Sequence, residues 1–455
     1  MKHWTIQIPL LGTVVAAMCS HGSVARAQLS SPQHPRSCIG TWTKPRVLKA
    51  ESSHRAYVDR PELSQIGDEL WAIGDPTLMS DAHERLVSLG EDSAWVAAGV
   101  HQKPGADASR IIRHPPGARE FLAPRTAASG HGLEVLWGGG SNPQRRGDPT
   151  VSEIWHARLD SSNWTDLERV VRVDALAWND VMSSELIILR GDLHVAAPLG
   201  VFPNASVLHL HSHHNAWRAD TIARDEGATY AALGSTESLL FLVTVVHSDR
   251  LLVRRSDDGG LSWNAAQEIV RVTQSTLHAP KVSSPMSRAT GERLFVLWAE
   301  AGNAGLPYER IRAAASSDDG SSWQLLPPLR TAPGLGFAVA RIGEGRLAVA
   351  NWVTGGEGRI DVAVWDGTRW RRRVSFAPAA SQPAMIVLGD SLYLLWGVAP
   401  VHPGAAPHTR VALTSIRCAG TRKSAAGSRG TSALGAPREP ATRPFPHSQG
   451  GNTWH

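Results

Sequence analysis

Short apolar runs recur along the chain, and most of them end in tryptophan and begin after glycine, aspartate or glutamate. Runs of this length, bounded by turn-forming residues, predict β-strands rather than helices. Their spacing of roughly 40 to 60 residues is typical of a repeated structural unit. The runs lie at 93–96, 133–137, 193–196, 239–243, 294–298, 347–352 and 392–396. The pattern therefore predicts seven such units.

Most runs are followed by a loop, a second apolar strand and a turn that closes on tryptophan. Four short antiparallel strands per unit, repeated around an axis, are typical of a β-propeller, whose sheets bury their faces against their neighbours. We therefore predict an all-β propeller of four-stranded blades, with seven blades or, alternatively, six. A further apolar stretch at 69–74 comes too soon before the next run to begin a blade. We expect this N-terminal strand to complete the last blade and close the ring, which removes exposed sheet edges.

The N-terminus has the pattern of an export signal. Lys2 precedes an apolar run at 8–18 that is too short to span a bilayer, and the small-residue triplet 25–27 follows it. We predict a signal peptide at 1–27 and a secreted or extracytoplasmic protein, periplasmic or extracellular. Lipid attachment at Cys19 is an alternative. No later apolar run is long enough for a transmembrane segment.

The remaining chain divides into three parts. We predict an N-terminal leader at 28–64, the propeller at 65–418 and a disordered tail at 419–455, where Gly, Ser, Ala, Pro and Arg show no apolar periodicity. Cys38 and Cys418 lie just outside the first and last units, and an export pathway favours oxidation. We expect a disulfide that joins the two ends of the domain. Two unrelated buried thiols are the alternative.

The formal net charge of +5 is concentrated at the two ends of the chain. Lys2 and Arg26 leave with the predicted signal peptide, and the tail at 419–455 holds an excess of arginine and lysine over a single acid. The core is then close to neutral, without a basic stripe that could follow a phosphate backbone. We therefore expect no nucleic-acid partner.

Two turns share the pattern Ser-x-Asp-x-Gly-x-Ser-Trp, and degenerate relatives of it end at Trp164, Trp217 and Trp370. A short Asp side chain accepts hydrogen bonds from turn amides, and the Gly adopts a positive φ that a side chain disfavours. The Trp buries a large ring against the next sheet. We assign these residues structural roles rather than catalytic ones. Their positions are Ser256, Asp258, Gly260 and Trp263 in the first turn, and Ser316, Asp318, Gly320 and Trp323 in the second.

This pattern resembles the Asp-box, or BNR repeat, of the sialidase-like β-propeller superfamily, and the resemblance covers roughly residues 65 to 418. It implies a recognition module for carbohydrate or for a protein partner. The alternative is a divergent exo-sialidase-type glycoside hydrolase, and a third option is a protein-binding scaffold. Fold alone does not separate these functions. We expect a monomer that binds a glycan or an extracellular protein and uses no cofactor.

The resemblance also implies that ligands bind at the mouth formed by the loops opposite the Asp-box turns. Arginines and carboxylates that converge there suit an anionic or hydroxyl-rich ligand such as a glycan. Solvated loop charges with no ligand are the alternative for each cluster. The candidate ligand-binding residues are Arg145, Arg146, Asp148, Trp178, Asp180, Asp249, Arg250, Glu357 and Arg359.

True sialidases use three arginines, a tyrosine nucleophile paired with glutamate, and an aspartate acid/base, and their first arginine lies in a Phe/Tyr-Arg-Ile-Pro motif. This sequence lacks that motif. If the protein is sialidase-like, Tyr308 and Glu300 are the catalytic candidates. Whether it is an enzyme stays open at this point.

Three histidines alternate along one predicted strand, at His209, His211 and His213. Alternate residues share a face of a strand, but they lie about 7 Å apart, too far for one metal ion without other ligands. We therefore predict an exposed outer strand and no metal site.

Overall fold

In the computed structural model the described residues form strands and turns and contain no α-helix. They belong to one compact unit, His34–His455, and none of their segments is a helix that could cross a bilayer. The predicted signal peptide, Cys19 and the tail at 419–455 lie outside the described residues and stay predictions. The structure describes residues 38, 41–51, 56–66, 69–79, 86–88, 93–97, 109–113, 122–129, 132–140, 152–160, 163–173, 186–199, 204–213, 216–224, 226–283, 293–302, 307–343, 345–398 and 408–418.

Three sheets contain four antiparallel strands each, hydrogen-bonded in chain order. The first comprises β7 (Leu122–Ser129), β8 (Gly132–Gly140), β9 (Ser152–Asp160) and β10 (Asn163–Val173). The second comprises β11 (Ile187–Leu189), β12 (Asp192–Leu199), β13 (Ser206–His213) and β14 (Ala216–Ile222). The third comprises β15 (Ala228–Ser235), β16 (Leu240–Val246), β17 (Arg250–Ser256) and β18 (Gln267–Arg271).

An eight-stranded sheet contains two further four-stranded units, with β22 paired to β21 and β23 continuing from β21. The first unit comprises β19 (Ser275–Ser283), β20 (Leu294–Gly302), β21 (Tyr308–Ser316) and β22 (Gln324–Leu325). The second comprises β23 (Leu329–Gly343), β24 (Arg346–Val353), β25 (Arg359–Trp365) and β26 (Trp370–Phe376).

A nine-stranded sheet contains the two units that join the chain ends. One comprises β2 (Ala56–Ile66), β3 (Glu69–Met79), β5 (Ser93–Ala97) and β6 (Ser109–Arg113), with the short β4 (Leu86–Ser88) on β3. The other comprises β27 (Ala384–Leu388), β28 (Ser391–Gly397), β29 (His408–Arg417) and β1 (Arg46–Glu51).

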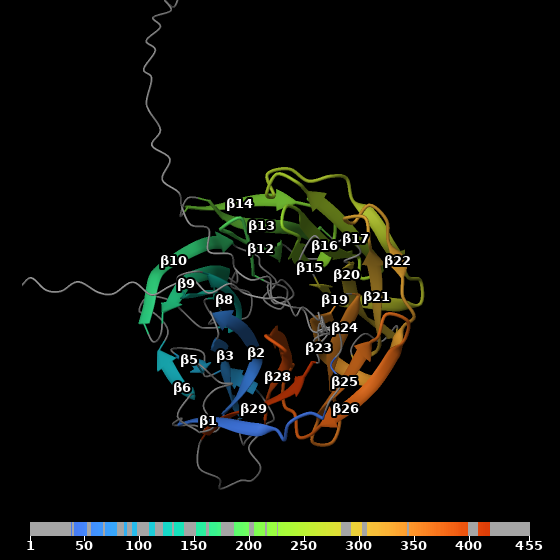
Figure 1. The fold of residues 1–455 in the computed structure, drawn as a ribbon. Coiled ribbons are helices and arrows are strands. Elements are labelled where there is room, and N and C mark those ends of the chain that lie inside the picture. The colour runs from blue at the N-terminus through green and yellow to red at the C-terminus, as the bar shows by residue number, and fades with distance from the viewer. Residues whose placement is uncertain are drawn as a thin grey trace, which may run out of the picture. The chain divides into compact units, whose positions relative to one another are not determined.

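The first strands of neighbouring units contact one another in a closed series. β2 contacts both β7 and β27, and the contacts continue from β7 through β11, β15, β19 and β23 to β27. The sheets within this unit therefore surround a common centre, as Figure 1 shows. The fold is an all-β propeller with four-stranded blades, as predicted.

The strand that completes the last blade differs from the one expected. β1 pairs antiparallel with β29, from Arg46 opposite Leu413 to Glu51 opposite His408. The stretch 69–74 instead lies in β3, between β2 and β5. The predicted leader at 28–64 thus contains two strands of the propeller, β1 and β2. The prediction missed them because their sequences carry no tryptophan-ending apolar run.

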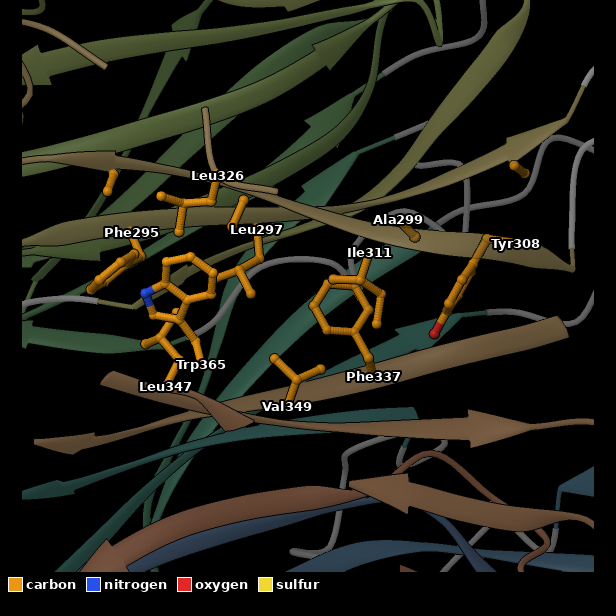
Figure 2. Packing of buried hydrophobic residues seen from close by; sticks show 13 residues of the cluster. Phe295, Leu297, Ala299, Tyr308, Ile311, Leu326, Phe337, Leu347, Val349 and Trp365 are labelled. Carbon is orange, nitrogen blue, oxygen red and sulfur yellow. The ribbon is translucent and has the colours of Figure 1, made fainter. Parts of the chain in front are cut away.

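Inner strands of the described blades bury side chains on both faces, and β20 shows this most clearly. Phe295 and Leu297 pack into a core with Ile311, Phe337 and other residues of β21, β23 and β24, which Figure 2 shows. The residues between them on β20, such as Val296, pack into a different core with β16 and β17. Alternation along a strand therefore places successive side chains in the two interfaces that flank one blade.

The two Ser-x-Asp-x-Gly-x-Ser-Trp turns have the same hydrogen bonds. Asp258 Oδ1 accepts from Ser256 Oγ at 2.8 Å and from Ser262 N at 2.9 Å. Ser256 Oγ in turn accepts from Gly260 N at 2.7 Å. The second turn repeats each contact through Asp318. These bonds satisfy turn groups that no strand ladder pairs.

Both glycines of these turns have the expected positive φ, +89° for Gly260 and +78° for Gly320. The two tryptophans pack against the preceding sheet rather than the following one. Trp263 contacts a core that includes Ala196 and Val207 of β12 and β13. Each turn therefore fixes its own blade to the blade before it.

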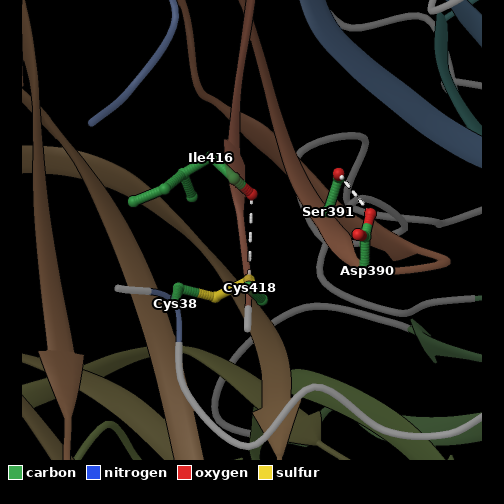
Figure 3. The surroundings of a disulfide bond; sticks show 5 residues. All are labelled: Cys38, Asp390, Ser391, Ile416 and Cys418. Carbon is green, nitrogen blue, oxygen red and sulfur yellow. Dashed lines mark hydrogen bonds between the residues drawn. A yellow bond between two sulfur atoms is a disulfide. The ribbon is translucent and has the colours of Figure 1, made fainter. Parts of the chain in front are cut away.

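The predicted disulfide is present. Cys38 and Cys418 are bonded across a sequence separation of 380 residues, and both are buried, as Figure 3 shows for their surroundings. Cys418 follows β29 directly, and its amide donates to Asp390 O at 2.6 Å. The covalent bond and the β1–β29 pairing thus join the same two chain ends.

Candidate functional site

The predicted mouth residues fall into two groups. Arg145, Arg146, Asp148, Trp178 and Asp180 lie outside the described residues, so their role stays a prediction. Among the described members, both arginines pair with an aspartate close to them in sequence. Arg250 Nε lies 3.7 Å from Asp249 Oδ1, and Arg359 Nε donates to Asp361 Oδ1 at 3.0 Å. Glu357 is exposed.

Tyr308 and Glu300 point to opposite faces of their sheet. The Tyr308 side chain is 1% exposed and shares a core with Ala299 and Ala301, the neighbours of Glu300 on β20. Since adjacent strand residues alternate, Glu300 faces the other side, where it accepts from Ser275 Oγ at 3.0 Å. Glu300 therefore does not pair with Tyr308.

Tyr308 also has the environment of a core residue. Its hydroxyl donates to Asn351 Oδ1 at 2.7 Å, and burial raises the pKa of the phenol well above its ordinary value. A nucleophilic tyrosine needs the opposite, a neighbouring base that removes its proton. The geometry does not support Tyr308 as a nucleophile.

The structure instead brings five polar side chains together on β8, β9 and β10. His156 Nε2 lies 3.0 Å from Glu134 Oε2, and its Nδ1 lies 3.0 Å from Glu168 Oε1. Arg158 donates to Glu134 Oε1 at 2.9 Å and to Asp166 Oδ2 at 2.8 Å. We call these five residues the Glu134–His156 cluster. The arrangement is an imidazole between two carboxylates, with a guanidinium alongside.

The strand register explains this convergence. Glu134 lies opposite Arg158 across β8 and β9, and His156 lies opposite Glu168 across β9 and β10. An irregularity between Thr165 and Glu168 shifts the register of β10 at this point. Leu133 and Val135 flank Glu134 and pack into the opposite interface. The cluster therefore faces the second four-stranded sheet, β11–β14.

Hydrogen bonds within the cluster stabilise the charged forms of Glu134 and Arg158. Burial disfavours the Glu134 carboxylate, but hydrogen bonds from His156, Ser129 and Arg158 outweigh it and lower the pKa of Glu134 to about 2. The bond to Glu134 likewise raises the pKa of Arg158. Glu134 is thus ionised at neutral pH, as a hydrogen-bond acceptor rather than a proton donor.

A pocket of about 860 Å³ adjoins the cluster between the two sheets. Glu134, His156, Arg158 and Glu168 line one side, and Trp217 of β14 lines the other. The Trp217 indole donates to Glu168 Oε1 at 2.6 Å, and its ring meets His156 edge-on at 5.4 Å between centroids. The volume lies within the range of small-molecule sites, about 300–1,000 Å³.

No motif in the sequence marks this cluster. Its members lie on three strands and are separated by up to 34 positions, from Glu134 to Glu168. A signal was available in polar residues that alternate with buried apolar ones, as in Trp155-His156-Ala157-Arg158. Only the strand register shows that these alternating positions meet.

The histidines on β13 also differ from the prediction of an exposed strand. His209 and His211 are buried, at 0% and 3% exposed. His213 is exposed, and its Nδ1 lies 3.2 Å from Asp192 Oδ2. A further buried imidazole beside these two belongs to His194 of β12, which lies opposite His211. These three side chains are the group of described residues that could hold a metal ion.

No family model and no curated protein matches the sequence. The fold is similar to several solved structures at low identity. A protein of unknown function from Dyadobacter fermentans is 14% identical over 82% of this chain and 99% of that one, with a TM-score of 0.49. Trypanosoma rangeli sialidase in complex with the inhibitor DANA is 12% identical over 84% of this chain and 60% of that one, at 0.44. Hadza microbial sialidase Hz136 is 12% identical over 81% and 66%, also at 0.44.

Proposed function

We propose that this protein is an extracytoplasmic recognition module whose ligand is a carbohydrate. The observation that carries the proposal is the pocket between β7–β10 and β11–β14, lined by the Glu134–His156 cluster and Trp217. It combines charged hydrogen-bonding groups held in fixed positions with an aromatic side chain. That combination suits a ligand with many hydroxyl groups and apolar ring faces.

The charges of the pocket favour a neutral or basic sugar. Glu134, Asp166 and Glu168 supply three carboxylates, and Arg158 supplies one guanidinium. Carboxylate oxygens accept hydrogen bonds from neighbouring hydroxyls, and charge-assisted bonds of this kind are stronger than neutral ones. An anionic sugar such as a sialoside would meet surplus negative charge at this site.

The side chains that line the pocket are better suited to binding a sugar than to hydrolysing a glycoside. Glycoside hydrolysis needs one carboxylic acid that is protonated, with a raised pKa, and one carboxylate. The pKa of Glu134 is lowered instead, and both of its oxygens are occupied by His156 and Arg158. Exo-sialidase activity with Tyr308 as the nucleophile is the alternative. The burial of the Tyr308 phenol argues against this activity.

A glycan array, followed by calorimetry with the best neutral oligosaccharide, tests the proposal. We expect binding without turnover. Trp217→Ala and Glu134→Gln should each weaken affinity at least about tenfold, which corresponds to about 1.4 kcal/mol. Glu268→Gln is the matched control, because Glu268 pairs with Arg271 on an exposed strand away from this pocket. Thermal unfolding of each variant verifies that it remains folded.

Three outcomes would overturn the proposal, and the first is release of sugar from a fluorogenic glycoside that Glu134→Gln or Tyr308→Phe abolishes. The second is glycan binding that Trp217→Ala leaves intact but Arg145→Ala or Asp180→Ala removes. The third is binding to no glycan at all. The second result would place the ligand in the predicted mouth loops. Binding to no glycan but capture of a purified extracellular protein would favour the scaffold function.

We also propose a blade number, an Asp-box assignment for the two turns and a location for the protein. The series β2, β7, β11, β15, β19, β23 and β27 supports seven blades, because each of these strands begins a four-stranded unit and contacts its neighbours. The hydrogen bonds of Asp258 and Asp318 support an Asp-box assignment for both turns. The disulfide supports an oxidising, extracytoplasmic location, as the predicted signal peptide implies.

A further inference from the structure

Three imidazoles from two strands meet in the interface between the second and third four-stranded sheets. His194 lies on β12, and His209 and His211 lie on β13. The three rings are 5.1 to 5.9 Å apart between centroids. Each of these residues is at most 3% exposed. We call these residues the three-histidine cluster.

The cluster leaves buried ring nitrogens without hydrogen bonds. His194 Nδ1 and His209 Nε2 lie 3.2 Å apart and satisfy each other. Among the described residues, His209 Nδ1 and both nitrogens of His211 have no hydrogen-bond partner. The Asp220 Oδ2 atom lies 4.0 Å from His211 Nε2, beyond hydrogen-bond distance. Leaving such groups unpaired in the protein interior destabilises the fold, so we expect these ring nitrogens to have another partner.

We infer that His194, His209 and His211 bind one divalent transition-metal ion. One nitrogen from each imidazole lies within 4.8 Å of the other two. Nitrogens around a tetrahedral zinc ion at 2.0–2.1 Å lie about 3.3 Å apart, so the three nitrogens need to approach one another by at most about 1.5 Å. The partner from β12 overcomes the spacing limit of a single strand, because His194 lies directly opposite His211.

The protonation of the cluster suits a metal. Burial lowers the pKa of His194 to about 4 and that of His209 to about 3, and it also lowers the pKa of His211. All three imidazoles are therefore neutral at neutral pH, the form that donates a lone pair to a metal. The absence of a thiolate favours zinc or copper(II) over softer ions.

One side of the cluster is closed and the other adjoins a pocket. The turn of the following blade covers His209, with the Trp263 ring edge-on at 5.4 Å between centroids. A pocket of about 310 Å³ adjoins His194 and His211 and is also lined by Asp192 and Asp258. Three protein ligands beside a pocket leave room for a water or a ligand at a fourth metal position.

The test uses the full mature chain without a histidine tag, stripped with chelator and titrated with Zn²⁺ alone and with Cu²⁺ alone. Calorimetry and elemental analysis should give one ion per chain, and the Cu²⁺ form should show nitrogen hyperfine coupling by electron paramagnetic resonance. His211→Ala should weaken binding by more than the roughly 10- to 100-fold that loss of an outer-shell partner costs. His213→Ala, on the same strand but exposed, is the matched control.

His209→Phe keeps the test valid if His211→Ala fails to fold. A phenyl ring already occupies the corresponding place in the next interface, where Phe241 lies beneath Gly320. This variant should be folded and should lose the ion. The inference is overturned if the folded wild-type chain takes up neither ion in stoichiometric amount. It is equally overturned if His209→Phe binds as tightly as the His213→Ala control.

Discussion

Gly260 lies so close to His209 that a Cβ atom on it would be 2.3 Å from His209 Cε1. The same relationship recurs one interface further on, where a Cβ on Gly320 would be 2.7 Å from Phe241 Cε1. In both cases the turn of one blade rests on an aromatic ring of the blade before it. Glycine is therefore needed at this motif position for two reasons. Its φ is positive, and an aromatic ring lies where a Cβ atom would be.

This contact predicts different costs for two adjacent glycines. Gly259 and Gly260 both have positive φ, but nothing lies within 4 Å of a Cβ on Gly259. Gly259→Ala should lower the free energy of unfolding by about 1–2 kcal/mol from backbone strain alone. Gly260→Ala should add an overpacking cost of about 1–3 kcal/mol. Urea denaturation measures both values.

A double-mutant cycle isolates the contact with the ring. In a His209→Ala background the excess cost of Gly260→Ala over Gly259→Ala should largely disappear, because the clashing atoms are gone. Equal costs for the two glycines in the wild-type background would show that the ring yields without penalty and that only backbone strain matters.

The disulfide predicts a large loss of stability when it is removed. Cys38 and Cys418 close a loop of almost the whole propeller, and the β1–β29 pairing lies beside them. Cys38→Ser combined with Cys418→Ser should lower the free energy of unfolding by about 2–4 kcal/mol. Denaturation of the double variant beside the oxidised wild type measures this difference.

Reduction of the wild type is the control for this prediction. The reduced protein should unfold at the same denaturant concentration as the double variant, since both lack the covalent closure. A double variant as stable as the oxidised wild type would mean that the β1–β29 hydrogen bonds alone hold the ring closed.

The repeat pattern was sufficient to predict the propeller fold because each blade carries its own apolar runs within a short stretch of sequence. The run at 294–298 alternates between two interfaces, so its apolar character reflects burial on both faces. β1 and β2 were missed because neither carries a tryptophan-ending apolar run. In addition, β1 pairs with the distant β29 rather than with a neighbour in sequence. The disulfide was predictable, since both cysteines flank the repeats.

The three-histidine cluster and the Glu134–His156 cluster could not be predicted from the sequence for a related reason. His194 and His211 meet only because β12 and β13 align them, and the spacing along β13 alone suggested rings too far apart. Glu134, His156 and Glu168 likewise depend on the register of three strands. Sequence patterns show which face a residue occupies, whereas its partner across the sheet depends on register.

Tyr308→Phe tests whether the phenol is structural. Removing the hydrogen bond to Asn351 should lower the free energy of unfolding by about 1 kcal/mol, with an unpaired Asn351 amide adding to the cost. Glycan affinity should not change, because Tyr308 lies in a core apart from the Glu134–His156 cluster. Chemical denaturation and calorimetry check the two expectations, and a loss of affinity at unchanged stability would contradict them.

The Glu134 carboxylate predicts acid sensitivity with a defined direction. Its pKa is lowered from 4.5 to about 2 in the folded protein. A depressed carboxyl pKa stabilises the fold fully above the unfolded value and loses this contribution as the pH falls toward the folded value. The contribution of Glu134, at most about 3 kcal/mol, should therefore disappear between pH 4.5 and pH 2.

Other carboxylates with lowered pKa values titrate in the same range, among them Asp258 and Asp318. The measurement is therefore the difference in unfolding free energy between wild type and Glu134→Gln, followed from pH 7 down to pH 2.5. This difference should be largest above pH 4.5 and should shrink steadily below it. A difference for Glu134→Gln that stays constant across the range would mean that the cluster holds the side chain by shape rather than by charge.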